Sequence, residues 1–149
     1  MHEYVDAEHI VTMAEEGKVE LLDASVSAEA NQHLKAKFPL RSWSTIVAWD
    51  RIPSSSLAWV KATNDETVEW VMTTSAANSD FGLLLFSPNQ RCVIAPLEFM
   101  ARHLDELVGH APGCRVVFAV DRDANGKVVF GRGVIEFNGK GELFATTED

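Results

Sequence analysis

The feature that most constrains the fold is the dipeptide Asn125-Gly126, which lies between two runs of β-branched and aromatic residues. This arrangement is a strong sign of a β-hairpin, because an Asn-Gly pair readily adopts the positive φ angles of a tight type I′ turn. A two-residue turn places Val116 opposite Ile135, and Arg115 opposite Glu136 as a cross-strand charge pair. The sequence therefore predicts both a hairpin and its register.

Two glycines lie in the second strand of this hairpin. In the predicted register Gly131 faces Val120 and Gly133 faces Phe118. A glycine inside a strand often marks a close approach by another group, so we expect a ring to lie over these two positions. A further strand returns after Asn138-Gly139 and completes a C-terminal β-meander.

An amphipathic helix, Pro96 to Val108, precedes the hairpin. Its apolar residues recur at helical spacing and form one stripe: Leu97, Met100, Ala101, Leu104, Leu107 and Val108. Gly109 follows as a C-terminal cap. Phe99 and His103 lie on a flank, where they either pack under a neighbouring loop, the interpretation that we favour, or face a partner. The stripe predicts that this helix packs on the sheet.

The N-terminal part of the chain predicts two helices. The first spans about Ala7 to Glu16, with Asp6 as its N-cap and a glycine directly after it. The second spans about Ala28 to Lys37, is capped by Ser27, and ends at a Phe-Pro pair because the residue before proline avoids the α region. The segment Lys18 to Ala24 either extends the first helix or forms a short strand.

Five strands are expected in the middle of the chain, where β-branched and aromatic residues are enriched. They are Trp43–Asp50, Leu57–Ala62, Thr67–Thr73, Phe81–Phe86 and Arg91–Ala95. The third strand has an apolar face made of Val68, Trp70 and Met72. The fourth strand is apolar almost throughout, which indicates burial on both faces, and it forms a hairpin with the fifth.

Together these elements predict an α+β fold in a single domain over residues 1–149. We expect two N-terminal helices, a mainly antiparallel sheet of about seven strands, and the helix 96–108 packed on that sheet. A crossover through this helix from Arg91–Ala95 into Cys114–Asp121 would create one parallel pair, so a mixed sheet stays open. The chain shows no signal-peptide pattern and no apolar run of about 18 residues, and we expect a soluble cytoplasmic protein.

The motifs that carry chemistry are absent or incomplete. Asp121, Asp123 and Asn125-Gly126 match the first half of a calcium-binding EF-hand loop, but Arg132 stands where that loop needs a bidentate acid. The histidines have no zinc-binding spacing, and no nucleophile or dinucleotide motif is present. Both cysteines lie in apolar runs, which is typical of reduced core thiols. The sequence therefore predicts no metal, no cofactor and no catalytic residue.

The charge of the chain is its unusual property. Its 22 acidic and 13 basic side chains give a net charge of −9. Residues 1–30 contain eight acids and one base, and so contribute −7 of that total. Such a field repels nucleic acids and acidic lipids and attracts basic proteins. Solubility alone is the other explanation of the same charge.

This profile predicts a protein-binding role, most concretely that of an immunity protein that neutralises a basic, nuclease-type bacterial toxin. Inhibition of that kind requires only a complementary surface, in which charge adds association rate and specificity. The residues expected to contact the partner are Glu15, Glu16, Glu20, Asp23 and an exposed aromatic anchor, Trp59.

Two other functions fit the same sequence. One is a small-molecule-binding domain or enzyme, with a pocket between the sheet and helix 96–108 that Trp59, Trp70 and Arg132 would line. The other is a subunit of an assembly that pairs through a sheet edge. The sequence leaves the oligomeric state open.

Overall fold

The computed structural model describes residues 7–40, 46–52, 55–59, 63–108, 115–138 and 142–147. In chain order the elements are α1 (Glu8–Glu15), β1 (Glu20–Leu22), α2 (Ala24–Lys37), the 3₁₀ turn η2 (Trp49–Arg51), β2 (Ser55–Trp59), α3 (Asp65–Val71), the 3₁₀ turn η3 (Ser75–Asn78), β3 (Phe81–Leu85), β4 (Cys92–Pro96), α4 (Leu97–Arg102), α5 (Leu104–Val108), β5 (Arg115–Arg122), β6 (Val128–Phe137) and β7 (Glu142–Thr146). The predicted α+β class is confirmed.

The described strands form one sheet of seven, in the order β1-β4-β3-β5-β6-β7-β2. Every neighbouring pair in it is antiparallel. The predicted hairpin of β3 and β4 is present, and so is the C-terminal meander of β5, β6 and β7. Because β3 lies between β4 and β5, the parallel pair that the sequence left open does not form.

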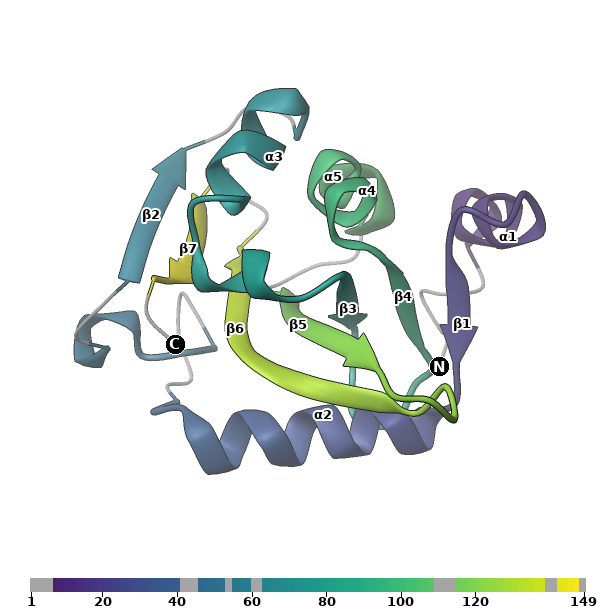
Figure 1. Ribbon diagram of the computed structural model, residues 1–149, viewed down its shortest axis with the longest axis horizontal. Helices are drawn as coiled ribbons and strands as arrows, with labels where there is room; N and C mark the ends of the chain where they lie inside the picture. The colour runs from purple at the N-terminus through teal and green to yellow at the C-terminus, as the bar shows by residue number, and fades with distance from the viewer. Residues whose placement is uncertain are drawn as a thin grey trace.

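Helices cover both faces of this sheet (Figure 1). The long helix α2 lies along one face, here called the α2 side, whereas α1, α3, α4 and α5 lie on the other, here called the helical side. Each side has its own apolar core. Leu84 packs with Met100 on the helical side, and Leu83 and Phe118 pack with Leu34 on the α2 side. β3 is buried on both faces, which explains its continuous apolar sequence.

The hairpin of β5 and β6 is present, but its predicted register is wrong. Gly126 has φ +80°, its N–H donates to the carbonyl of Asp123 at 2.9 Å, and the N–H of Asp123 donates to the carbonyl of Lys127 at 3.0 Å. These bonds close a three-residue loop. The carboxylate of Asp123 stabilises the wider loop by accepting from the N–H groups of Asn125 and Lys127. A loop of one more residue moves the pairs next to it, Asp121–Val129 and Arg122–Val128, by one position, and the irregularity between Phe118 and Val120 moves the pairs beyond it by two positions in the opposite sense.

The shift removes the predicted charge pair. Arg115 faces Phe137 and Val116 faces Glu136, so the guanidinium and the carboxylate lie on opposite faces of the sheet. Arg115 belongs to the helical side, where its guanidinium lies 5.8 Å from the ring centre of Phe86. Glu136 is fully buried on the α2 side.

The two strand glycines have a different function from the predicted one. They lie where the register of β5 and β6 shifts, between the pairs Phe118–Val134 and Val120–Phe130. A Cβ atom on Gly133 would lie 2.5 Å from the backbone nitrogen of Ala76. The glycine is therefore required because the backbone of η3 packs directly on β6, and not because a ring covers it.

The predicted strand Thr67–Thr73 is wrong, because this segment forms helix α3. Asn64 is the N-cap, and its side chain accepts from the N–H of Glu66 at 2.9 Å while Thr67 Oγ1 accepts from the N–H of Asn64 at 3.1 Å. This reciprocal capping satisfies two donors of the first turn and favours the helix. As a result Met72 is not on a core face and is 39% exposed.

The predicted strand Trp43–Asp50 is also wrong over its described part. Val47 makes one isolated bridge to Leu40, and the chain then enters η2. The carboxylate of Glu136 accepts from the N–H groups of Ile46 and Val47, which a continuous strand would have used for sheet pairing. A buried acid thus replaces a strand neighbour here.

Smaller differences occur at the helix ends. The second helix begins at Ala24 with Asp23 as its N-cap, so Ser27 is buried inside the helix and does not cap it. The segment Lys18 to Ala24 contains the short edge strand β1. The predicted caps Asp6 and Gly109 lie outside the described residues.

The helix predicted over Pro96–Val108 is interrupted at His103, which separates α4 from α5. The reason is a pair of side-chain acceptors: Thr63 Oγ1 accepts from the N–H of Asp105, and Asp105 Oδ1 accepts from the N–H of Glu106. These bonds compete with the regular helical ones. Phe99 packs against the core of the helical side, as we expected.

Candidate functional site

The four helices of the helical side carry most of the acidic side chains found in the helices. Together α1, α3, α4 and α5 contain eight carboxylates and one Lys or Arg residue, Arg102. The carboxylates are Glu8, Glu15, Asp65, Glu66, Glu69, Glu98, Asp105 and Glu106, and we call this set the acidic helical surface. By contrast, α2 carries one acid, Glu29, and two bases, Lys35 and Lys37. The sheet therefore separates helices with a net charge of −7 from a helix with a net charge of +1.

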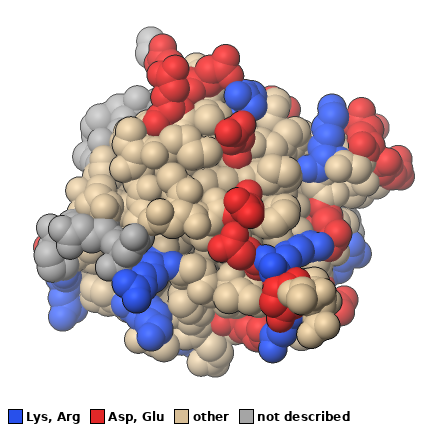
Figure 2. Space-filling model, in the orientation of Figure 1, with Lys and Arg blue, Asp and Glu red and all other residues tan. Residues whose placement is uncertain are grey.

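The figures show part of this separation, while acidic and basic side chains also lie together at the lower right of Figure 2, where Figure 1 has the loop between β5 and β6. In Figure 2, acidic side chains gather along the upper and right parts of the molecule, where Figure 1 has α3 and α1. Basic side chains gather at the lower left, where α2 ends. The helices of the helical side also form one layer, since α3 contacts α4 and α5 contacts α1. The carboxylates therefore belong to neighbouring elements of one side and not to separate regions.

The local folding of the helices explains why seven of these eight acids are exposed, Asp105 being half-buried. In α3 the apolar residues Val68 and Val71 are buried against the core, which leaves Asp65, Glu66 and Glu69 facing solvent. Acids in the first turn of α3 and of α5 also interact favourably with the positive end of the helix dipole. Packing and capping together orient these carboxylates outward, except that of Asp105, which accepts hydrogen bonds from the N–H and the hydroxyl of Thr63.

An open cleft of about 430 Å³ lies in this surface, where the start of α3 meets the junction of α4 and α5. Its lining consists of polar and charged residues: Thr63, Asn64, Asp65, Glu66, Arg102, His103 and Glu106. Arg102 Nε lies 2.7 Å from Asp65 Oδ1, and His103 Nδ1 lies 3.1 Å from Glu106 Oε1. Acids outnumber bases along the cleft, so it extends the negative field of the surface.

The structure places the four predicted contact acids at the sheet edge beside this surface. Glu15 and Glu16 are exposed at the end of α1, Glu20 is exposed on β1, and Asp23 caps α2. Two of them have a basic neighbour. Glu16 lies 3.7 Å from the amine of Lys18, and Glu20 lies 2.6 Å from the guanidinium of Arg122. Glu15 is the member of the predicted set that belongs to the acidic helical surface.

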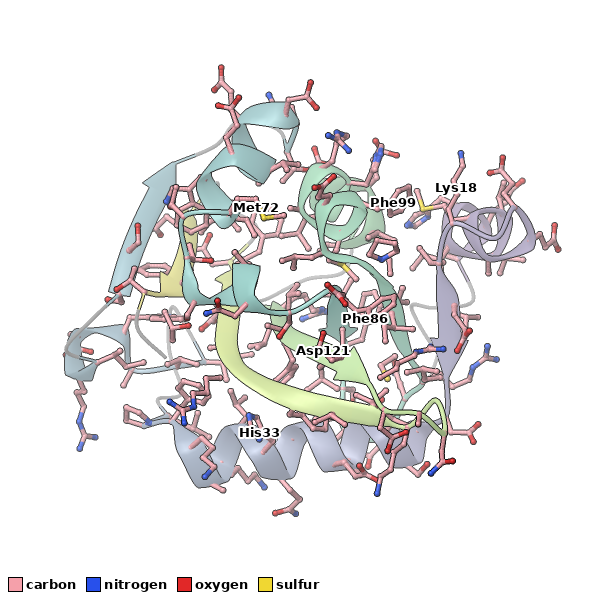
Figure 3. All side chains as sticks on the ribbon, in the orientation of Figure 1. Lys18, His33, Met72, Phe86, Phe99 and Asp121 are labelled. Atoms are coloured by element: carbon pink, nitrogen blue, oxygen red, sulfur yellow. The ribbon has the colours of Figure 1, made fainter. Side chains whose placement is uncertain are left out.

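The predicted aromatic anchor is only partly described. Trp59 ends β2, an edge strand, and its side chain lies outside the described part of the structure. Trp49 is buried, and Trp70 is half-buried and donates from Nε1 to Ser56 Oγ at 3.1 Å. An exposed apolar side chain of the helical side is Met72, which follows α3 (Figure 3).

Among the described residues, a small cavity lies between the sheet and helices α4 and α5. The cavity there has a volume of about 10 Å³ and apolar walls apart from Thr67. A volume of this size holds about one water molecule. Neither Trp70 nor Arg132, which the small-molecule hypothesis needed, lines this cavity, and Arg132 is exposed.

The two hairpin aspartates that match the calcium-loop motif, Asp121 and Asp123, accept hydrogen bonds from backbone N–H groups. Asp121 accepts from the N–H of Asp80 at 2.9 Å, and Asp123 accepts from two N–H groups of its own turn. Among the described residues there is no group of three metal-ligating side chains. Cys92 is a free, buried thiol, and burial raises its pKa, which disfavours the reactive thiolate.

Sequence reasoning missed the acids of α3 and of the α4–α5 junction as a functional set. The reason is that residues 67–73 were assigned to a strand, which separated Glu69 from Asp65 and Glu66. The signal that identifies the helix is Asn64 followed three residues later by Thr67, with two acids between them.

No protein-family model matches the chain, and a search of curated proteins finds no match. Within the described ranges no helix has both the length and the apolar character that crossing a bilayer requires.

Proposed function

We propose that this protein binds a basic protein through its acidic helical surface, most concretely as an immunity protein that neutralises a cationic, nuclease-type bacterial toxin. The observation that supports this is the grouping of eight carboxylates with one base on neighbouring helices of one side. Exposed charges of one sign steer an oppositely charged protein and raise its association rate. A nuclease cleft, which is cationic because it binds phosphates, is such a partner surface.

The acidic surface also has features that a binding interface needs besides charge. The open cleft between α3 and the α4–α5 junction offers a recess for a partner's side chain. Met72 offers exposed apolar area next to the acids of α3. Flexible methionine side chains suit such contacts, because they adapt to the shape of a partner. The edge acids Glu16, Glu20 and Asp23 extend the negative field towards β1.

We expect a toxin gene directly upstream of the gene of this protein, and the test measures binding to the cationic nuclease domain that such a gene would encode. Reversing two charges of the acidic helical surface, in the variant Glu66→Lys/Glu69→Lys, should lower the association rate about tenfold at low salt. The matched control, Lys35→Glu/Lys37→Glu on α2, reverses the same number of charges on the other side and should leave the rate within about twofold. Salt should weaken binding of the unmodified protein and close the gap between it and the first variant.

The variant Glu15→Lys/Glu16→Lys compares the predicted edge acids with the acids of α3. If this variant lowers the association rate as much as Glu66→Lys/Glu69→Lys does, the interface extends to the edge of the sheet. The proposal is wrong if the nuclease does not bind, or if every charge reversal leaves affinity and salt dependence unaltered.

A further inference from the structure

His33 connects α2 to the hairpin of β5 and β6 on the α2 side of the sheet (Figure 3). Its ring stacks on Phe130, with centroids 5.0 Å apart and planes at 19°, and meets Phe118 edge-on at 6.1 Å. Ala30 and Leu34, its neighbours on the buried face of α2, are almost inaccessible to solvent. The imidazole is therefore part of the contact by which α2 covers its side of the sheet.

The surroundings of this imidazole disfavour its charged form. Burial lowers the pKa of His33 below its ordinary value of 6.5, Lys37 one turn further along α2 lowers it again, and a hydrogen bond to the backbone of Gly131 acts in the opposite direction. The two rings that contact it carry no charge. Glu29, one turn earlier on α2, and Arg132, which follows Gly131 on β6, are both exposed.

Because the pKa of His33 is lowered and not raised, the pH range in which its protonation affects the docking of α2 follows from the sign of the shift. The pKa of His33 is lower while α2 is docked than after α2 is released. The released state therefore binds a proton more readily than the docked state. Docking is therefore strongest above a pH of about 6.5, where both forms are neutral, and weakens as the pH falls through that value.

We propose that His33 is an acid-sensitive switch for the docking of α2, and that protonation of its half-buried imidazole loosens the packing of α2 on the hairpin and makes the core of the α2 side more accessible. The apolar residues that would become more exposed include Val120, Phe118 and Phe130. This switch is independent of the proposed binding of a basic partner, because the acidic helical surface lies on the other side of the sheet.

The test is amide hydrogen exchange of the intact protein at a pH of about 7.5 and of about 5, corrected for the intrinsic exchange rates. Protection of the amides in α2 should fall several-fold at the lower pH, whereas protection in β3 should stay the same. Equal protection of α2 at both values would overturn the proposal.

Three variants identify the responsible group. His33→Gln stays neutral and should remove the pH dependence, whereas His33→Lys is charged at both values and should loosen α2 throughout. His9→Gln changes an exposed histidine of α1 and should behave like the unmodified protein. A pH dependence that persists in His33→Gln would contradict the proposal.

An NMR titration of His33 in the unmodified protein supplies a test that needs no variant. Its midpoint should lie below that of histidine in the denatured chain. A midpoint at or above that of the denatured chain would overturn the proposal even if the His33 variants fail to fold.

Discussion

The two sides of the sheet use carboxylates in opposite ways. On the helical side Asp65 has 83% of its side chain exposed, and its neighbour in space is Arg102, whose side chain is 41% exposed. On the α2 side Glu136 is fully buried, and it accepts hydrogen bonds from the backbone N–H groups of Ile46 and Val47 and from Trp49 Nε1. One acid supplies charge to a surface, whereas the other holds a chain segment in place.

The difference follows from the cost of dehydrating a charge. A buried carboxylate is tolerated only when donors replace its water, and those donors in turn depend on it. An exposed carboxylate keeps its water and contributes little to stability. We therefore expect substitutions on the α2 side to change the free energy of unfolding, and charge substitutions on the helical side to change association with a partner.

The largest effect is expected for Glu136→Leu. This change removes an acceptor from three N–H donors, two of them buried and that of Ile46 partly buried, and should lower the free energy of unfolding by about 3 kcal/mol, measured by urea denaturation. Glu136→Gln keeps one oxygen acceptor and the same shape, so it should lower the free energy of unfolding by only about 1 kcal/mol. If the Leu variant is as stable as the unmodified protein, the buried acid is not what holds residues 46–49.

An intermediate effect is expected for Gly133→Ala, which tests the close packing of η3 on β6. The added Cβ would lie 2.5 Å from the backbone nitrogen of Ala76, so the backbone must move, at a cost of about 2 kcal/mol. Gly131→Ala is the control, because its shortest contact, 2.7 Å, is with the hydroxyl of Ser79, a side chain that can rotate. Thermal denaturation should rank Gly133→Ala as the less stable variant, and the reverse order would contradict this packing.

The smallest effect is expected for Arg102→Met. This change removes the one Lys or Arg residue in the four helices that carry the acidic helical surface. Its ion pair with Asp65 is exposed to solvent, so the free energy of unfolding should change by less than about 0.5 kcal/mol. Association with a cationic partner should become faster, because the surface gains negative charge. Asp65→Asn breaks the same ion pair but removes negative charge, and should slow association. A large loss of stability in both variants would show that this pair is structural, and would weaken the contrast between the two sides.

The elements with strong local patterns could be predicted from the sequence. The hairpin at Asn125-Gly126, the central strand at Phe81–Phe86 and the stripe of helix 96–108 were predicted, because apolar periodicity and turn residues act within a few positions along the chain. The register of the hairpin could not be predicted. It depends on the carboxylate of Asp123, which widens the loop, and on the irregularity between Phe118 and Val120, and a net shift of one residue exchanges the two faces of a strand.

The assignment of residues 67–73 failed for a related reason. Over seven residues an alternating pattern and a helical one are hard to separate, and the capping by Asn64 and Thr67 decided between them. The candidate site was missed as a consequence, since its acids come from helices that are distant in the sequence. Counting charges along the chain found Glu15 but not the acids of α3 and α5.

The sequence by itself determined the α+β class, the antiparallel meander, the strand Phe81–Phe86 that is buried on both faces and the excess of acid, because each of these depends on local pattern or on composition. Only the tertiary structure decided the strand register, the burial of Glu136 and the gathering of acids on one side of the sheet. Those features depend on which distant segments pack together, and that packing is set by contacts and hydrogen bonds that leave no periodic trace along the chain.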